Sequence, residues 1–168
     1  MSRVYLSLGT NLGDRRANIQ AAIALLRLET EIASSSGIKT TAVTLVTAVS
    51  PLYKTAPWGI TDQPDFLNLC VAADTDLSPH DLLARLKTIE AELGRKTAVR
   101  WGPRLIDIDI LFYDDLVLRD DQLTIPHASI ADRAFVLAPL ADITPDLLHP
   151  QTAVSIQTML DAVDQTRS

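Results

Sequence analysis

The chain has 168 residues, enough for one domain with a sizeable buried core, and its apolar fraction of 47% and charged fraction of 21% are ordinary for a soluble globular protein. A net charge of −6 argues against broad binding to nucleic acid, and a single cysteine excludes an internal disulfide. No stretch resembles a signal peptide or a membrane span. Residues 1–168 are therefore expected to form one cytoplasmic domain that does not bind a membrane, with a monomer as the default state.

The N-terminal part predicts two strands and one helix. Residues 4–8 form a short apolar strand, and Asp14 caps a helix whose apolar positions are spaced three and four residues apart. Residues 29–41 are rich in Ser and Thr and have no period, so they are expected to be a surface connection. Residues 43–54 form a β-branched strand, with Pro51 near its exposed end or at a bulge.

A loop and a third strand follow. Residues 55–64 contain two prolines, a glycine and a tryptophan without any period, which indicates a functional loop. Residues 65–75 alternate as a strand, with Phe66, Asn68 and Cys70 on one face. Because a buried amide must be paired, Asn68 is either harmlessly exposed or hydrogen-bonded to a bound ligand, and the residues alone leave both interpretations open.

The next segment predicts a second helix and a basic loop. Ser78 caps the helix, Pro79 takes its first position, and Gly94 ends it. Glu90 lies on this helix, where the exposure preference of glutamate favours a solvated position. Residues 95–103 are the densest basic segment of an acidic chain, so a small anionic ligand is a better partner than a long one.

The most informative stretch is the strand at residues 106–110, in which isoleucine alternates with aspartate. Asp107 and Asp109 therefore point to the same face, at a spacing of roughly 6.5–7 Å that suits one divalent cation or a close pair. Arg100 and Arg104 lie just upstream, and cations beside metal-binding acids indicate a polyphosphate site. An acidic strand face is more often simply solvated, but aspartate is disfavoured in strands, so both interpretations remain open from this motif alone.

The C-terminal part predicts a hairpin and two helical segments. Residues 116–125 form the hairpin and lead to His127, which is either a surface residue or a donor to phosphate. Residues 129–140 are expected to be helical. The tail helix, at about residues 153–163, buries one apolar face.

The resulting order, β-α-β-β-α-β, predicts an α+β protein with a ferredoxin-like core, in which two helices pack on one face of an antiparallel sheet. The hairpin and the C-terminal helices are additions to this core. The first strand and the aspartate strand are expected at the centre of the sheet, with the aspartates facing away from the two helices. The residues alone leave three functions open: a phosphate-transferring enzyme, a metal-dependent phosphodiesterase or nucleotidyl transferase, and a non-catalytic ligand-binding domain.

Five motifs in order resemble the family of 6-hydroxymethyl-7,8-dihydropterin pyrophosphokinases of folate biosynthesis. The motifs occupy residues 9–13, 53–55, 62–68, 100–109 and 123–127, so the resemblance covers essentially the whole chain. It implies transfer of the β,γ-pyrophosphoryl group of ATP, the co-substrate, to the hydroxymethyl group of a reduced pterin, with release of AMP. It also implies two Mg²⁺ ions held by Asp107 and Asp109.

The resemblance further implies a role for individual residues. Those expected to be catalytic are Arg95, Arg104, Asp107 and Asp109. Those expected on the nucleotide and phosphate side are Glu90, Arg95, Arg104, Ile125, His127 and Arg133. Those expected around the pterin are Thr55, Ala56, Trp58, Phe66, Asn68, Asp107 and Phe135, with the two phenylalanines sandwiching the ring. Those expected in a mobile catalytic loop are Lys96, Arg100 and Trp101.

Some positions depart from the pattern of the family. The basic loop is one residue shorter than in members with a second arginine there, and Lys96 cannot reproduce the bidentate contact of an arginine. Ala128 stands where many members have an aromatic residue or proline. The segment at residues 29–45 is longer than in compact members. None of these departures affects the aspartate pair.

Overall fold

The computed structural model describes residues 1–33, 35–56, 62–94 and 105–166, with side chains described as far as Val163. Its main sheet is antiparallel, and its strands lie in the order β4 (Thr44–Val49), β6 (Phe66–Thr75), β1 (Ser2–Thr10) and β7 (Asp107–Tyr113), with β5 (Tyr53–Thr55) also pairing with β6. Two small hairpins are separate from this sheet: β2 (Thr30–Ala33) with β3 (Lys39–Ala42), and β8 (Leu118–Arg119) with β9 (Thr124–Ile125).

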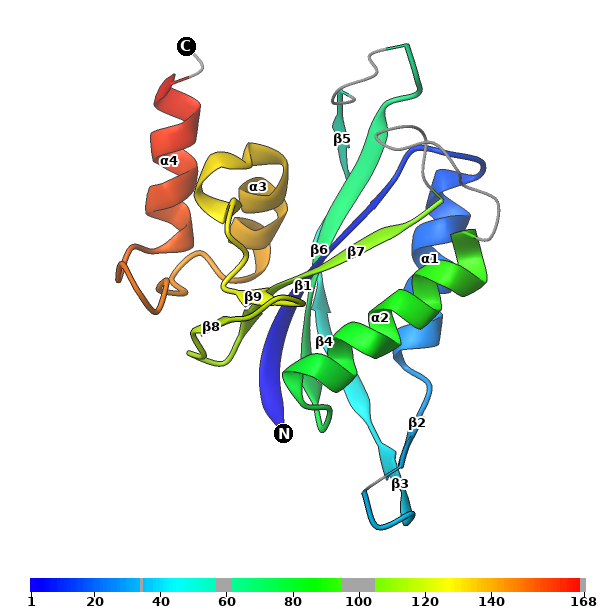
Figure 1. Ribbon diagram of the computed structural model, residues 1–168. Coiled ribbons are helices and arrows are strands. Elements are labelled where there is room, and N and C mark those ends of the chain that lie inside the picture. Colours follow the sequence, from blue (N-terminus) through cyan, green and yellow to red (C-terminus); the bar gives the residue numbers. More distant parts are fainter. Residues whose placement is uncertain (34, 57–61, 95–104, 167–168) are drawn as a thin grey trace.

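Helices cover both faces of the sheet (Figure 1). On one face lie α1 (Arg15–Leu26) and α2 (Pro79–Gly94), and on the other lie α3 (Ala134–Ile143) and α4 (Ile156–Thr166), with the short 3-10 helix η1 (Ile130–Asp132) just before α3. Each face has its own hydrophobic cluster. The cluster under α1 and α2 includes Leu6, Leu86, Ile106, Ile108 and Ile110, and the one under α3 and α4 includes Cys70, Phe112, Leu137 and Ile156.

The isoleucines that alternate with Asp107 and Asp109 show which way these aspartates point. Ile106, Ile108 and Ile110 are at most 5% exposed and belong to the cluster under α1 and α2. Because side chains alternate along a strand, Asp107 and Asp109 face the other way. The prediction that the acidic face looks away from these two helices is therefore confirmed.

The predicted position of the aspartate strand within the sheet is wrong. β7 lies at one end of the strand order, whereas β1 and β6 are central. The outer edge of β7 is met by other groups: the Glu90 carboxylate accepts a hydrogen bond from the N–H of Ile108, and the N–H of His127 donates to the carbonyl of Leu111. The helix α2 and the segment after β9 therefore flank the outer edge of β7.

Two predictions for the segment between α1 and β6 also need correction. Residues 29–41 contain β2 and most of β3 rather than an irregular connection, and three of the four residues of β3 are exposed. An exposed hairpin needs no apolar period, so this hairpin has no signal in the hydrophobic pattern of the sequence. The strand predicted at residues 43–54 is divided into β4 and β5 by residues 50–52, which include Pro51, a residue without a backbone N–H for the ladder.

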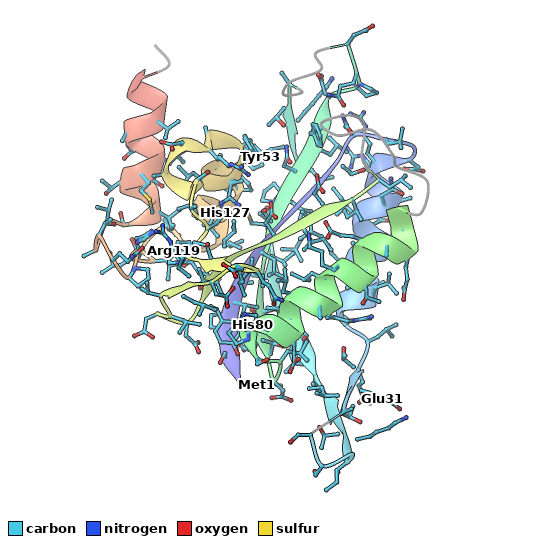
Figure 2. All side chains as sticks on the ribbon, in the orientation of Figure 1. Met1, Glu31, Tyr53, His80, Arg119 and His127 are labelled. Atoms are coloured by element: carbon cyan, nitrogen blue, oxygen red, sulfur yellow. The ribbon has the colours of Figure 1, made fainter. Side chains whose placement is uncertain are left out.

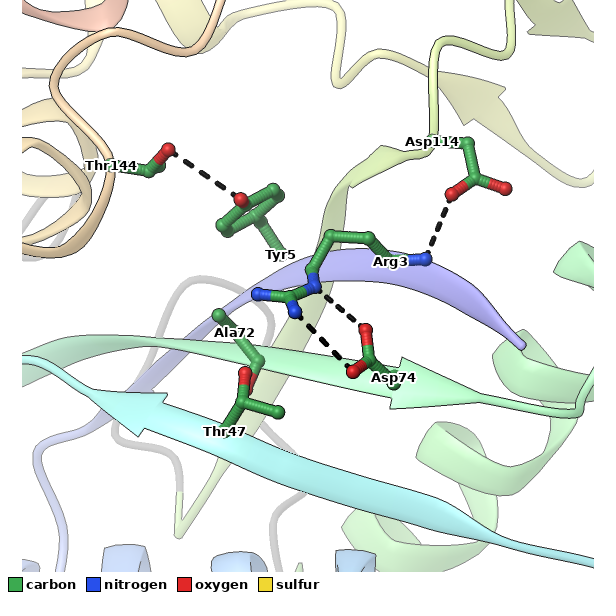
Figure 3. Close-up of polar contacts among 7 residues, drawn as sticks. All are labelled: Arg3, Tyr5, Thr47, Ala72, Asp74, Asp114 and Thr144. Carbon is green, nitrogen blue, oxygen red and sulfur yellow. Dashed lines mark hydrogen bonds and ion pairs between the residues drawn. The ribbon is translucent and has the colours of Figure 1, made fainter.

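Polar contacts tie β1 to its neighbours at the end of the sheet far from Gly9 (Figure 3). Arg3 Nε donates to Asp74 Oδ1 on β6 at 2.7 Å, and the Arg3 N–H donates to Asp114 Oδ1 at 2.8 Å. Farther along β1, the hydroxyl of Tyr5 lies 3.5 Å from that of Thr144, which ends α3. These contacts fix α3 and the end of β7 relative to the central strand.

Several local predictions are confirmed. Asp14 caps α1, and Ser78 Oγ accepts from the N–H of Asp81 at the start of α2. Cys70 is buried with its Sγ 3.6 Å from the carbonyl of Val136, and this burial raises the pKa of the thiol. No helix in the described ranges is long and apolar enough to cross a membrane.

Replacing Asp14 by alanine should lower the free energy of unfolding by about 1 kcal/mol, the usual cost of losing an N-cap. Its Oδ1 accepts from the N–H of Ala17 at 3.1 Å, and alanine offers no acceptor. Urea unfolding of Asp14→Ala and Asp14→Ser tests this, because serine restores a capping oxygen. Equal losses in both variants would argue against the cap.

Candidate active site

The polar face of the sheet is built around Gly9 in β1. The register places Gly9 opposite Asn68 of β6 on one side and opposite Asp107 of β7 on the other. Two residues earlier, Ser7 lies in the same way between Cys70 and Asp109. Since opposed residues share a face, the amide and both carboxylates project to one side, separated only by the small residues of β1.

The aspartate pair has the chemistry of a magnesium site. Asp107 and Asp109 are both half-buried on β7. Within the part of the chain that is described, no group of three or more His, Cys, Asp or Glu residues could hold a metal ion. Magnesium ordinarily binds one or two carboxylates, substrate phosphates and water, so a pair of aspartates fits the ion when a polyphosphate supplies further oxygens.

His127 lies near enough to Asp109 and Arg133 for the charges of both to affect its pKa. Burial lowers the pKa of His127; Asp109 opposes this effect, and Arg133 adds to it. The N–H of Ser129 donates to His127 Nδ1 at 3.2 Å, so the neutral ring carries its proton on Nε2. The Nε2–H of His127 is a donor suited to a phosphate oxygen.

Phe135 connects this charged group to an aromatic surface. The guanidinium carbon of Arg133 is 5.8 Å from the centroid of the Phe135 ring, within range of a cation–π contact. Phe135 is half-buried at the start of α3 and packs against the cluster under α3 and α4. The Phe135 ring is therefore held beside the guanidinium of Arg133.

A hydrogen bond from β5 holds the C-terminal end of α3. The hydroxyl of Tyr53 on β5 donates a short hydrogen bond to the carboxylate of Asp142, and this bond is the main cause of the raised pKa of Tyr53. Phe135 and Asp142 are about two helical turns apart, so they share a face of α3. Figure 2 shows Tyr53 and His127 near α3, on the side of the sheet away from α1 and α2. No role for Tyr53 was predicted from the sequence.

The pterin side predicted from the resemblance is grouped on β5 and β6. Asn68 is 9% exposed, and its Nδ2 donates to Thr55 Oγ1 at 2.6 Å. Phe66 is half-buried two residues earlier on the same face, and Ala56 is exposed just after β5. Asn68 is therefore a buried amide with a partner, and the interpretation that it is harmlessly exposed is wrong.

Asn11 and Arg15 support the chain just before β6, and a role for neither was predicted from the sequence. Asn11 is fully buried, and its Nδ2 donates to Gln63 Oε1 at 2.8 Å and to the Pro64 carbonyl at 3.0 Å. Arg15 donates to the carbonyl of Asp65 at 2.8 Å. Both lie in or near the motif at residues 9–13, which was the available signal for their importance.

Glu90 is not the solvated helix residue that its type suggested. Its side chain is 17% exposed, its Oε2 accepts from the N–H of Ile108 at 3.1 Å, and its Oε1 lies 3.2 Å from Lys87 Nζ. It therefore holds the backbone between Asp107 and Asp109. Its predicted contact with the nucleotide remains a prediction.

Replacing Glu90 by alanine should lower the free energy of unfolding by about 2 kcal/mol, as expected for a hydrogen bond to a charged group. Because Ile108 lies between the two aspartates, turnover should also fall, by about tenfold. Glu90→Gln, which keeps an acceptor oxygen, should lose less of both. Urea unfolding and steady-state kinetics measure the two effects; an increase in the KM for ATP alone, without loss of stability, would favour direct nucleotide contact instead.

The remaining predicted residues are less informative. Ile125 is 1% exposed in the cluster under α1 and α2, so any contact with a nucleotide would have to come from its backbone. The others lie outside the described residues: Trp58, Arg95, Lys96, Arg100, Trp101 and Arg104.

Known proteins with similar sequences share one activity in their names. Residues 5–145 match the family described as 7,8-dihydro-6-hydroxymethylpterin-pyrophosphokinase (HPPK). The chain is 47% identical over 148 residues to the 2-amino-4-hydroxy-6-hydroxymethyldihydropteridine pyrophosphokinase of Methylorubrum extorquens, covering 88% of this chain and 86% of that protein. The protein of the same name from Pseudomonas aeruginosa is 45% identical over 150 residues, covering 89% of this chain and 85% of the relative.

Larger proteins contain a related segment. The mitochondrial folate synthesis bifunctional protein of Pisum sativum is 46% identical over 152 residues, which cover 90% of this chain but only 27% of the plant protein. Among solved structures, wild-type HPPK-DHPS of Plasmodium falciparum with pteroate superposes with a TM-score of 0.69 at 19% identity, covering 96% of this chain and 42% of that one. At this identity the superposition supports the fold alone. The match to the family over residues 5–145 and the identity of 45–47% to two pyrophosphokinases together mean that the chain belongs to the 7,8-dihydro-6-hydroxymethylpterin-pyrophosphokinase family.

Proposed function

We propose that Asp107 and Asp109 hold two Mg²⁺ ions for the pyrophosphoryl transfer of this enzyme, and that Phe66, Asn68 and Phe135 bind its pterin. The chain is a pyrophosphokinase of folate biosynthesis, which transfers pyrophosphate from ATP to the hydroxymethyl group of 6-hydroxymethyl-7,8-dihydropterin and releases AMP. One observation carries the proposal: both carboxylates and the Asn68 amide lie on the same face of the sheet, with β1 between β7 and β6.

The phosphate side is proposed from charge and hydrogen-bonding capacity. Mg²⁺, when bound, would neutralise the charge that develops on the phosphate oxygens. His127 donates from Nε2 and Arg133 from its guanidinium to the triphosphate, and such charge-assisted hydrogen bonds are strong. Arg95 and Arg104 are assigned to the same side from the resemblance to the family. Four donors of this kind would orient the β-phosphorus toward the pterin.

The pterin side is proposed from shape and polarity. Phe66 and Phe135 come from β6 and α3, and both are half-buried, as rings that flank a flat heterocycle should be. The Asn68 amide offers a donor and an acceptor to the pyrimidine edge of the pterin, next to Thr55. Backbone groups of Thr55, Ala56 and Trp58 complete the proposed contacts.

The proposed chemistry relies on positioning. Phosphoryl transfer needs little covalent work from side chains, so the enzyme gains rate by holding the hydroxyl in line with the β-phosphorus and by stabilising charge. Between the two half-sites β1 presents the small residues Ser7 and Gly9, which lets the substrates meet above it. We assign no dedicated general base.

Further properties of the fold and organisation are proposed with this activity. The strand order β4-β6-β1-β7, with α1 and α2 on one face, supports a ferredoxin-like description of the core. One domain over residues 1–168 and a monomeric, cytoplasmic enzyme that binds neither nucleic acid nor membrane remain our predictions for its organisation.

The products of the reaction test the proposed function. Purified protein is incubated with ATP, Mg²⁺ and 6-hydroxymethyl-7,8-dihydropterin, and the nucleotide product is separated by chromatography. We expect AMP that forms only when the pterin is present and that disappears when EDTA removes the metal. ADP, cleavage of added nucleic acid, or turnover that is indifferent to EDTA would contradict the proposal.

A further inference from the structure

Gly9 leaves space that the side chain of Asn68 occupies. A Cβ atom added to Gly9 would lie 2.8 Å from Asn68 Oδ1, closer than real Cβ contacts, and 3.8 Å from Phe66 Cδ1. The amide of Asn68 therefore lies directly over the backbone of β1. Any residue other than glycine would put its side chain where that oxygen is.

The backbone at Gly9 does not itself require glycine. Gly13 and Gly37 are the described glycines with positive φ, and Gly9 lies in the regular pairing of β1 with both β6 and β7. An alanine there would fit the strand conformation. The reason for glycine at this position is therefore the space above it.

The Asn68 amide has little freedom to move away. On its other side, Nδ2 donates to Thr55 Oγ1 at 2.6 Å, and the residue is 9% exposed. Its backbone is fixed because β6 pairs with β1 on one edge and with β5 on the other. Gly9 and Thr55 thus hold the amide between them.

We propose that Gly9 is a positioning residue for pterin recognition, because its missing side chain lets the Asn68 amide lie close against β1, where it can meet the polar edge of a pterin stacked on Phe66. This inference rests on the proposed function, in which Asn68 binds the pterin. A methyl group at position 9 would push Asn68 Oδ1 upward by about 0.6 Å to reach the 3.4 Å of an ordinary contact. The displaced amide would lose its alignment with Thr55 and with the edge of the pterin.

A displacement of this size should weaken pterin binding strongly and change the stability of the fold little. Misplacement by about 1 Å in a positioned site can cost about a hundredfold, whereas alanine suits a strand at least as well as glycine. We therefore expect Gly9→Ala to raise the KM for the pterin by more than about tenfold. The KM for ATP should stay within about twofold, and the midpoint of thermal unfolding should change little.

A double-mutant cycle isolates the action of Gly9 through Asn68. The variants are Gly9→Ala, Asn68→Ala and the two combined, with Gly37→Ala in the distant β2–β3 turn as a glycine control that should leave both KM values unchanged. With Asn68 truncated, nothing remains for the new methyl group to displace. Gly9→Ala should then add less than about twofold to the pterin KM of Asn68→Ala.

The outcomes separate the inference from the proposed function. An unchanged pterin KM in Gly9→Ala, or the same increase with and without Asn68, would overturn the inference alone. An unchanged pterin KM in Asn68→Ala would overturn the assignment of Asn68 and the inference with it. If Gly9→Ala fails to fold, recovery of folding in the double variant supports the clash, and failure of both variants contradicts it.

Discussion

Replacing Asp107 or Asp109 by alanine is expected to reduce turnover by about a thousandfold, equivalent to about 4 kcal/mol of transition-state stabilisation. Both carboxylates project from β7 to the polar face, whereas the isoleucines that alternate with them fill the core. Alanine therefore removes the proposed metal ligands without opening a cavity, and the fold should persist. Single-turnover formation of AMP measures the effect.

Asp115→Ala is the matched control for this prediction. Asp115 is an exposed carboxylate in the turn that follows β7, at the opposite end from the site. Its replacement should leave turnover within about twofold of the wild type, as is usual for exposed surface positions. Near-wild-type activity in Asp107→Ala or Asp109→Ala, with circular dichroism unchanged, would remove the metal assignment.

Replacing Phe135 by alanine is expected to raise the KM for the pterin about 30-fold, because stacking of a flat heterocycle on an aromatic ring contributes about 2 kcal/mol. The KM for ATP should change far less, although loss of the cation–π contact frees Arg133 to some extent. Steady-state kinetics with each substrate varied in turn measures both constants.

Val136→Ala is a control on the same helix. Val136 is the next residue, but it is 4% exposed and packs in the cluster under α3 and α4. Its replacement should lower the free energy of unfolding by about 1 kcal/mol and leave the pterin KM unchanged. If the two variants raise this KM equally, Phe135 acts through the packing of α3 and does not stack on the substrate.

Much of the fold was predictable because its elements have strong local signals. The alternation in β6 and β7, the caps of α1 and α2, and the apolar stripe of α4 each appear within a few residues of sequence. The order of strands was harder. Strand pairing depends on contacts between segments that are distant in the sequence. The isoleucines of the aspartate strand are buried because α2 covers this edge, so their pattern is the same as that expected for a central strand.

The candidate site was predictable for the residues that resemble a motif and less so for those that support them. Asp107, Asp109 and Asn68 were identified, and the register brings them to one face. Glu90 was interpreted as solvated because nothing in its helix indicates that the β7 edge lies within reach. The roles of Gly9 and Tyr53 depend on cross-strand register and on the placement of α3, which only the three-dimensional structure provides.

The central claim is that two carboxylates on one strand hold the metal ions between the two substrates. Mn²⁺ bound in place of Mg²⁺, counted by electron paramagnetic resonance with a non-hydrolysable ATP analogue and the pterin present, tests it most directly. We predict about two ions per chain in the wild type, consistent with a two-metal arrangement on a polyphosphate, and loss of tight binding in Asp107→Ala and Asp109→Ala. The same number of tightly bound ions in these variants would contradict the account.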